Sequence, residues 1–356
     1  MIKKALFIVI LFTLLGGCSN SLSLLAPYKE IVSVYGLLNQ DDPVQYIRIE
    51  RVFLGAQDAH VMAQNQDSVY FKSGDIKVTL QRWINGVQVS VDNPSSSAME
   101  IVLTDTLIQA ATGVFNQNER VYKTNHKIYS DSQYNLTIHN NKSGKEFTAQ
   151  TGLIQNFAGQ LLPSTPGYPN ILVNHYNLNT KINIVPNAGL DYCYYNSPVN
   201  AGVCGLVLRF FYTEYNGGAS TKESLDIDLG TNYPIQTVGG EKQEFDFAGR
   251  LVLINMANLI PVNQSVTRTV DSAEFILTAA GQALALYNQV NMSTSLSQNK
   301  ANYSNINGGI GVFSCRNELK LLRSINSTTC VDTISGNSLT CKLRFLNSGG
   351  GLSICH

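Results

Sequence analysis

The stretch IKVTLQRWINGVQVSV, residues 76–91, carries the clearest fold signal in this chain. Apolar and polar residues alternate in it, and Asn85-Gly86 stands between its two halves. Asn-Gly is preferred where a two-residue hairpin turn needs positive φ at both positions. The stretch therefore predicts two antiparallel strands joined by a tight turn.

Similar short segments surround this hairpin and predict a strand-rich first half. The expected strands are 31–38, 45–53, 76–83, 87–91, 119–122, 134–139 and 146–151. About seven short strands separated by turn residues in this length are typical of an immunoglobulin-like β-sandwich, which we expect over residues 29–160.

Three prolines within 161–169 predict a linker, and a second β-rich domain is expected over 170–325. Its predicted strands are 170–173, 182–185, 204–212, 224–229 and 273–278. Apolar residues spaced by three and four predict two short packing helices near 245–260 and 281–290. Residues 326–356 form a cysteine-bearing tail, and the expected fold class is mainly β.

The composition excludes several classes of protein. The 356 residues include 25 basic and 25 acidic side chains, so the formal net charge is zero and no electrostatic footprint for nucleic acid is present. Charged residues make up only 14% of the chain, and 35 Asn supply much of the remaining polarity. Hydrophobic residues, at 44%, are sufficient for folded cores.

The N-terminus predicts export and a lipid anchor. Lys3 and Lys4 precede an apolar run over 5–15 that is too short to span a bilayer, which is typical of a signal peptide over 1–17. Leu15-Gly16-Gly17-Cys18 is similar to the lipobox of bacterial lipoproteins, in which the cysteine thiol is lipidated. Residues 18–28 are a tether, and Ser19 favours the outer membrane, either on its periplasmic face or at the cell surface.

Six further cysteines predict disulfides in an exported chain. They are Cys193, Cys204, Cys315, Cys330, Cys341 and Cys355. Fifteen connectivities are open to six cysteines. Turn signals between two of the pairs favour Cys193–Cys204 and Cys330–Cys341, which leaves Cys315–Cys355. Zinc is disfavoured because no Cys-x-x-Cys pair occurs, and we expect no metal site and no cofactor.

Several short strings resemble a family of Bacteroidota outer-membrane lipoproteins that carry a domain of unknown function. The strings are VYGLL (34–38), QYIRI (45–49), FLG (53–55), DSVYF (67–71) and the closing YSNINGGIGVF (303–313). Members of that family are often encoded beside TonB-dependent receptors, so the resemblance implies an accessory role in the envelope. The chain departs from the family pattern at Cys315 and in the tail that follows it.

Four Asp-Ser/Thr-aliphatic strings match the O-glycosylation sequon of Bacteroidota. Their acceptors are Ser68, Thr106, Ser272 and Thr333. An attached sugar would be bulky and directed to the surface, whereas ordinary strand composition explains the same strings equally well.

Catalytic motifs are scarce. The sequence contains no Gly-x-Ser-x-Gly, no His-Glu-x-x-His and no phosphate-binding loop, and its five histidines are scattered. Gly309 and Gly311 are interpreted as permitting a turn or close backbone approach. Asp226 and Asp228 share one face of a predicted strand, where they fit a carboxylate pair, a calcium ligand or a solvated strand edge.

The sequence therefore predicts a non-enzymatic outer-membrane lipoprotein. It would act as an accessory or binding subunit of an envelope complex, with a TonB-dependent receptor or another outer-membrane protein as partner. An envelope glycan hydrolase that uses paired carboxylates, and an adhesin, are the alternatives.

Overall fold

The structure is a computed structural model that describes residues 30–52, 69–92, 97–108, 119–155, 157, 172–173, 176–177, 181–182, 190–234, 239–291, 303–325 and 328–355. The predicted signal peptide, Cys18, the tether, Ser68 and the proline-rich linker lie outside these residues. The described chain is mainly β, as the sequence predicts.

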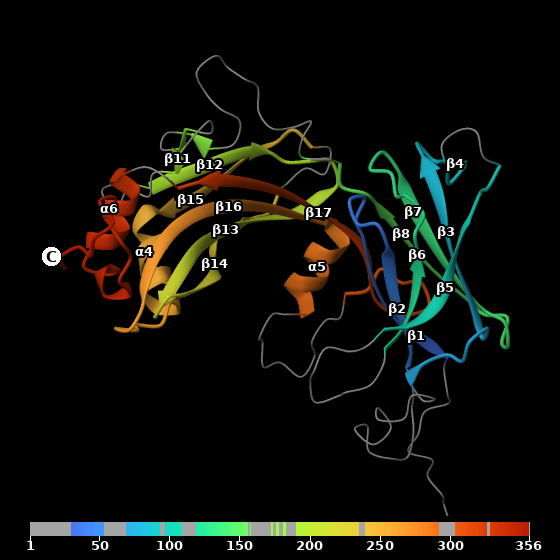
Figure 1. Ribbon diagram of the computed structural model, residues 1–356. Helices are drawn as coiled ribbons and strands as arrows, with labels where there is room; N and C mark the ends of the chain where they lie inside the picture. Colours follow the sequence, from blue (N-terminus) through green and yellow to red (C-terminus); the bar gives the residue numbers. More distant parts are fainter. Residues whose placement is uncertain are drawn as a thin grey trace, which may run out of the picture.

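Eight strands build a sandwich, on the right of Figure 1. They are β1 (Ile31–Leu38), β2 (Gln45–Val52), β3 (Ile76–Ile84), β4 (Val87–Val89), β5 (Ile101–Ile108), β6 (Glu119–Thr124), β7 (Gln133–Asn140) and β8 (Glu146–Gly152). The strand β5 serves two layers, because its first residues pair with β3 and its last with β6. One layer is β1-β2-β6 and the other is β3-β7-β8, while the finer immunoglobulin-like topology stays a prediction.

The predicted hairpin at 76–91 is confirmed. Ile84 pairs with Val87, and the two turn residues have positive φ, 50° at Asn85 and 77° at Gly86. Alternate side chains of β3 and β7 point into the sandwich, where Val78, Leu80 and Leu136 are almost fully buried. Period-two alternation therefore places the core here.

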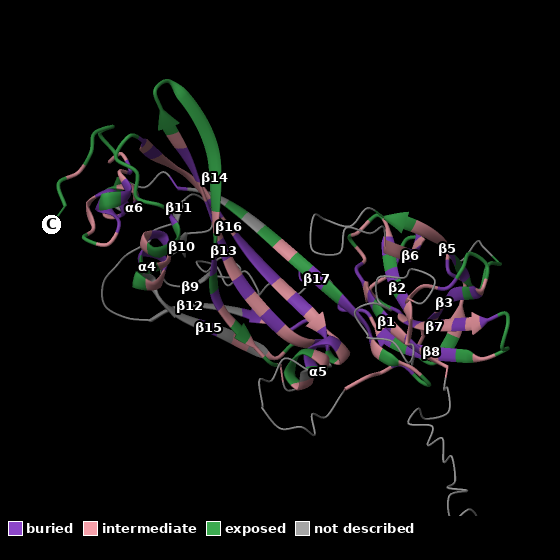
Figure 2. Ribbon diagram, turned by 90° about the horizontal axis from the view of Figure 1, so that it is seen from below, coloured by how far each residue is buried: buried purple, intermediate pink, exposed green. Residues whose placement is uncertain are grey.

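The second body is a curved sheet of long strands, on the left of Figure 1. Its order is β14-β13-β16-β17, with bounds β13 (Ala201–Asn216), β14 (Ala219–Asn232), β16 (Thr267–Gly281) and β17 (Ile310–Ser324). Figure 2 shows buried and less buried residues alternating along these strands. A small sheet of β9 (Leu172–Val173), β12 (Leu190–Asn196) and β15 (Lys242–Ala248) accompanies it, and β10 (Tyr176–Asn177) pairs with β11 (Lys181–Ile182).

The strand β17 belongs to both bodies. Its first half, up to Cys315, pairs in parallel with β1, and its second half pairs antiparallel with β16. One continuous hydrogen-bonded sheet therefore runs through the molecule, and the sandwich takes a strand from the far end of the chain. The predicted division into the domains 29–160 and 170–325 does not include this sharing of a strand. An alternation of apolar and polar residues indicates that a segment is a strand, but it does not indicate which distant strand pairs with it.

The segment that leads into β17 is held against both β8 and β1. The Asn305 side chain accepts from the Phe313 N–H at 2.9 Å and donates to the Phe313 carbonyl at 2.7 Å. The Asn307 N–H donates to the Thr148 carbonyl at 2.7 Å. A Cβ on Gly309 would lie 2.8 Å from the Val32 carbonyl oxygen, so the predicted close approach is confirmed.

Three helices are described, and only one follows the sequence closely. The helix α5 (Gln282–Asn291) confirms the prediction over 281–290. The helix α4 (Gly249–Leu259) begins four residues later than predicted, because 242–248 pair with β12 and the Phe245 ring stacks on Tyr195 at 5.3 Å. The helix α6 (Thr328–Gly336) was not predicted, and the 3-10 turn η2 (Cys341–Leu343) follows it.

The C-terminal tail docks on the curved sheet through a buried arginine and an aromatic ring. The Arg268 side chain is fully buried and donates to the Glu214 carboxylate at 2.6 Å and to the Leu343 carbonyl at 2.5 Å. The Phe345 ring lies edge-on to Tyr212, with 5.7 Å between the ring centroids. The tail is therefore a folded part of the second body.

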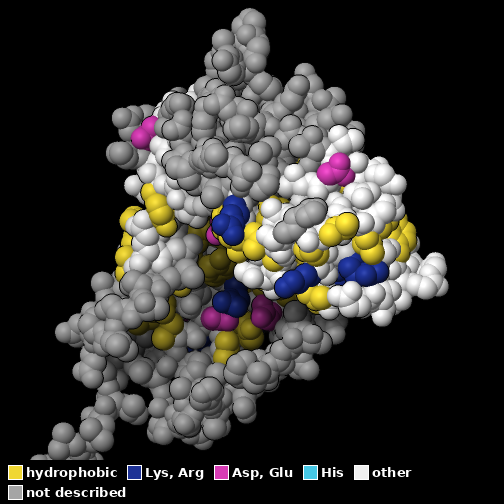
Figure 3. All heavy atoms as spheres, turned by 90° about the vertical axis from the view of Figure 1, so that its left-hand side faces the viewer, with side chains coloured by type: hydrophobic (Ala, Val, Ile, Leu, Met, Phe, Trp, Pro, Cys, Tyr) yellow, Lys and Arg dark blue, Asp and Glu magenta, His cyan; other side chains and the backbone are white. Residues whose placement is uncertain are grey.

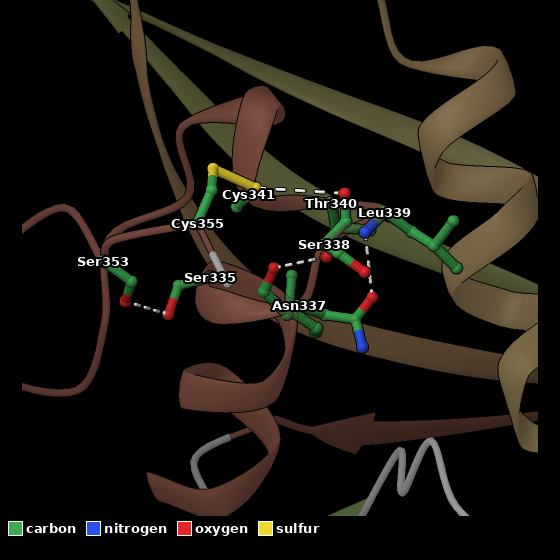
Figure 4. The surroundings of a disulfide bond; sticks show 9 residues. Ser335, Asn337, Ser338, Leu339, Thr340, Cys341, Ser353 and Cys355 are labelled. Carbon is green, nitrogen blue, oxygen red and sulfur yellow. Dashed lines mark hydrogen bonds between the residues drawn. A yellow bond between two sulfur atoms is a disulfide. The ribbon is translucent and has the colours of Figure 1, made fainter.

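The predicted cysteine pairing is wrong. Cys341 bonds to Cys355, next to the hydrogen bond between Ser335 and Ser353 (Figure 4). The proposed turn between Cys330 and Cys341 is instead the end of α6, which separates those two residues. The disulfide excludes both the Cys330–Cys341 and the Cys315–Cys355 pairings.

Cys204 and Cys315 carry free thiols buried in the sheet, so the predicted Cys193–Cys204 pair is also wrong. Cys204 lies within β13, where its backbone pairs with Ala279 and Asn232. The Cys193 side chain lies outside the described part of the structure.

The surface carries few charges, as the composition predicts. On the face shown in Figure 3, basic and acidic side chains occur singly or in small groups around a hollow, and uncharged groups cover most of the described surface. None of the described helices combines the length and the apolar character that crossing a bilayer requires.

Candidate functional site

Two neighbouring cavities open where the sandwich meets the curved sheet. They have volumes of about 300 and 350 Å³ and share Asp42 and Arg316. We call the pair the junction groove. The sandwich side is lined by Tyr35, Leu37, Tyr46, Arg48, Glu119 and Val121, and the sheet side by Gly205, Thr231, Thr278 and Glu318.

A hydrogen-bonded turn presents Asp42 to Arg316. The Gln45 amide donates to the carbonyls of Asn39 and Asp42, and its oxygen accepts from the Asn39 N–H at 2.9 Å. The Asn39 amide donates to the Asp42 carboxylate, whose second oxygen lies 2.8 Å from the Arg316 guanidinium. The ion pair joins residues 274 positions apart at the boundary between the two bodies.

Two exposed tyrosines dominate the sandwich side. Tyr35 and Tyr46 lie on β1 and β2 at outward positions of the alternation and are 42% and 46% exposed. Tyr35 lies opposite Arg48 in the antiparallel register. Both tyrosines belong to the strings that resemble the lipoprotein family. Neither side chain is buried in the core of the sandwich.

Asp226 and Asp228, the predicted carboxylate pair, lie on β14 at the edge of the curved sheet. Arg209 binds Asp226 through two hydrogen bonds of 2.7 and 2.8 Å, and this contact lowers the pKa of Asp226. Asp228 accepts from the Gly230 N–H at 2.9 Å. A glycosidase acid needs a raised pKa, so this pair fits the solvated strand edge better than a catalytic dyad.

The junction groove contains three carboxylates, Asp42, Glu119 and Glu318. Two of them form ion pairs, since Asp42 lies 2.8 Å from the Arg316 guanidinium and Glu318 lies 2.5 Å from the Lys320 ammonium group. Glycoside hydrolysis needs one carboxyl group that can donate a proton. The ion pairs of Asp42 and Glu318 leave only Glu119 without an ion pair among the described residues, whereas glycoside hydrolysis uses two carboxyl groups, so the groove favours recognition over hydrolysis.

The described O-glycosylation candidates lie within regular structure. Thr106 is in β5, Ser272 is in the central strand β16, and Thr333 is in α6. All three are half-buried. None of these three residues lies in a loop. Glycosylation of them, and of Ser68, stays a prediction.

The two described histidines have carboxylate partners. His126 lies 3.4 Å from Asp92, and His139 lies 3.3 Å from Glu146. Both occupy partly exposed positions on the sandwich, away from the junction groove. Among the described residues, no group of three or more His, Cys, Asp or Glu side chains lies together.

Comparisons with protein-family models and with curated proteins gave no match. The site is therefore defined by its geometry alone.

The Asp42–Arg316 pair could not be predicted from the sequence, because neither residue belongs to a motif and their contact depends on the pairing of β1 with β17.

Proposed function

We propose that this chain is a non-enzymatic lipoprotein of the outer membrane that binds a protein partner through the junction groove. Lipidation at Cys18 would anchor it, with Leu15-Gly16-Gly17-Cys18 as the supporting string and Ser19 favouring the outer membrane. Its role would be that of an accessory subunit in an envelope complex, and the partner class is an outer-membrane transporter such as a TonB-dependent receptor.

The observation that carries this proposal is the pair of exposed tyrosines beside arginines. Tyr35 and Tyr46 lie on adjacent strands with Arg48 and Arg316 in the same groove. Tyrosine and arginine are among the residues enriched at protein interfaces and at their hot spots, where truncation costs about 2 kcal/mol or more of binding energy. The ionic groups around the tyrosines supply a polar rim.

The position of the groove suits a partner in the same membrane. Twelve residues, 19–30, connect Cys18 to the first residue of β1, and such a length spans at most about 40 Å when fully extended. Tyr35 follows within β1. Anchoring would therefore keep the groove within reach of proteins embedded in that bilayer.

Affinity purification of the lipidated protein from outer membranes tests the proposal. After cross-linking, the natural protein should recover an outer-membrane transporter, and the variant Tyr35→Ala/Tyr46→Ala should recover at least tenfold less of it. The matched control is Tyr215→Ala/Tyr233→Ala, since those tyrosines are 42% and 52% exposed and lie on the other body. The control should recover as much transporter as the natural protein.

Two outcomes would contradict the proposal. Recovery of the protein alone would remove the accessory role, and equal recovery with both double variants would remove the junction groove from the interface. Release of reducing sugar from envelope glycans that is lost in Asp42→Asn would instead support the hydrolase alternative.

A further inference from the structure

The outer face of the β3-β7-β8 layer carries a row of uncharged amides. Gln81 lies opposite Asn135, which lies opposite Gln150, so the three side chains cross the strands side by side. Trp83 lies opposite Gln133 in the next row. These positions alternate with buried core residues, which places all of them on the outward face.

Two cavities follow this row and share Gln150 and Asn305. Their volumes are about 310 and 400 Å³, and none of the residues lining them has a charged side chain. The amides that line them are Gln81, Gln133, Asn135, Gln150, Asn200, Gln282, Asn305 and Asn307. We call this surface the amide groove, and the Tyr303 ring belongs to its wall.

Hydrogen bonds orient the amides before any ligand arrives. The Gln133 NH₂ group donates to the Asn135 oxygen at 2.9 Å and to the Gln150 oxygen at 3.2 Å. The NH₂ groups of Asn135 and Gln150 have no acceptor among the described residues, and they remain available as donors. Gln81 makes no side-chain hydrogen bond within the described part of the chain, so it offers both a donor and an acceptor.

This chemistry selects a neutral ligand rich in hydroxyl groups. An amide presents a donor and an acceptor together, which matches neighbouring sugar hydroxyls, whereas a charged ligand would find no countercharge in the groove. Tyr303 adds an aromatic ring whose apolar face can stack on a sugar ring, and Trp83 lies beside the groove, opposite Gln133. An extended peptide is less suited, because Asn307 already pairs with the outer edge of β8 at Thr148.

We propose that the amide groove binds an uncharged oligosaccharide. The inference goes beyond the protein-partner role and does not rest on it, since the junction groove lies on the opposite layer of the sandwich. The two cavities together accommodate a chain of several sugar units along the row from Gln81 to Gln282.

Trp83 provides a nearby fluorescent reporter, because it lies opposite Gln133 and is the only tryptophan in the chain. The full-length protein, purified in a non-glycosidic detergent, is titrated with maltoheptaose, cellohexaose, mannohexaose and xylohexaose while its fluorescence is recorded. At least one of these probes should give a saturable change. Hexagalacturonate serves as an anionic comparison and should bind at least tenfold more weakly.

Variants locate the binding site. Gln150→Ala should weaken binding of the best probe about tenfold, the loss expected for one or two hydrogen bonds. Gln81→Ala should weaken it similarly, and its side chain supports no other part of the fold. Gln289→Ala, an exposed amide on α5 outside the groove, should bind like the natural protein.

Three results would overturn the inference. The first is the absence of both a fluorescence change and calorimetric heat with every neutral probe. The second is tighter binding of hexagalacturonate than of the neutral probes. The third is binding of a neutral probe that neither Gln81→Ala nor Gln150→Ala weakens. The co-purification experiment is unaffected by each of these, so the two proposals fail separately.

Discussion

A Cβ atom on Gly311 would lie 2.0 Å from the carbonyl oxygen of Val34. Gly311 also has a φ of +107°, which residues with a side chain rarely adopt. Gly311 and Val34 are register partners in the parallel pair of β17 and β1. Only glycine therefore lets the shared strand lie against the sandwich, and this contact makes the two bodies one sheet.

Replacing Gly311 should separate β17 from β1. We expect Gly311→Ala to lower the free energy of unfolding by about 3 kcal/mol or more, through the backbone clash and the disfavoured φ. Gly217→Ala is the matched control, because Gly217 also has positive φ, 56°, but faces open space, so a cost of about 1 kcal/mol is expected. Denaturant unfolding measures both, and equal losses would contradict the role assigned to Gly311.

The buried Arg268 should determine whether the C-terminal tail docks. Arg268→Met removes the ionic contact with Glu214 and leaves the carbonyls of Leu343 and Pro261 without their donor, so we expect a loss of about 3 kcal/mol. Arg209→Met removes an exposed ion pair and should cost no more than about 1 kcal/mol. Hydrogen exchange over residues 328–355 should accelerate in the first variant and stay unchanged in the second.

The disulfide should stabilise the tail locally. Cys341 and Cys355 close a loop with a sequence separation of 14, for which removal of the bond costs about 3 kcal/mol. Cys355→Ser should therefore increase proteolytic cleavage within residues 328–355. The sandwich, probed by exchange at β3 and β7, should stay unchanged, and its destabilisation to the same extent would show that the bond acts globally.

The buried thiols of Cys204 and Cys315 should make stability fall at high pH. Burial raises the pKa of Cys204 and of Cys315 to about 11, from an ordinary 9.0. Between pH 9 and 11 the folded chain keeps both protons while the unfolded chain releases them, so the stabilisation present below pH 9 is lost as the pH rises to 11. Each thiol should account for about 2 to 3 kcal/mol.

Urea unfolding across that pH range measures the effect, and Cys204→Ala/Cys315→Ala should flatten the profile between pH 9 and 11. Iodoacetamide at pH 8 should modify neither thiol until the chain is unfolded. Rapid labelling of the native chain would show that these thiols are not buried.

Local patterns predicted most strands of the sandwich and the middle of β13, β14 and β16, but not β5, β12, β15 or β17, and they predicted no distant pairing. The segment 31–38 is β1 as predicted, and the Asn85-Gly86 turn follows from the φ values that its two residues permit. Strand alternation carries no information on partners, so the pairing of β1 with β17 and the Asp42–Arg316 contact were missed. The start of α4 was misplaced because Phe245 fits both a helical spacing and the alternation of β15.

The cysteine errors have the same origin. The turn signal between Cys330 and Cys341 predicts a hairpin, whereas the nine residues Thr328–Gly336 form a helix. The fifteen connectivities were open, and only the three-dimensional arrangement brings Cys355 to Cys341. The composition predicts a surface rich in amides. The alignment of Gln81, Asn135 and Gln150 depends on strand register, which the composition does not contain.

Intact-mass measurement of the protein extracted from outer membranes tests the central claim most directly. We predict a mature chain that begins at Cys18 and carries a diacylglyceryl group on its thiol and a third acyl chain on its amine. A mature chain that begins at another residue and bears no acyl group would contradict the membrane-held binding role.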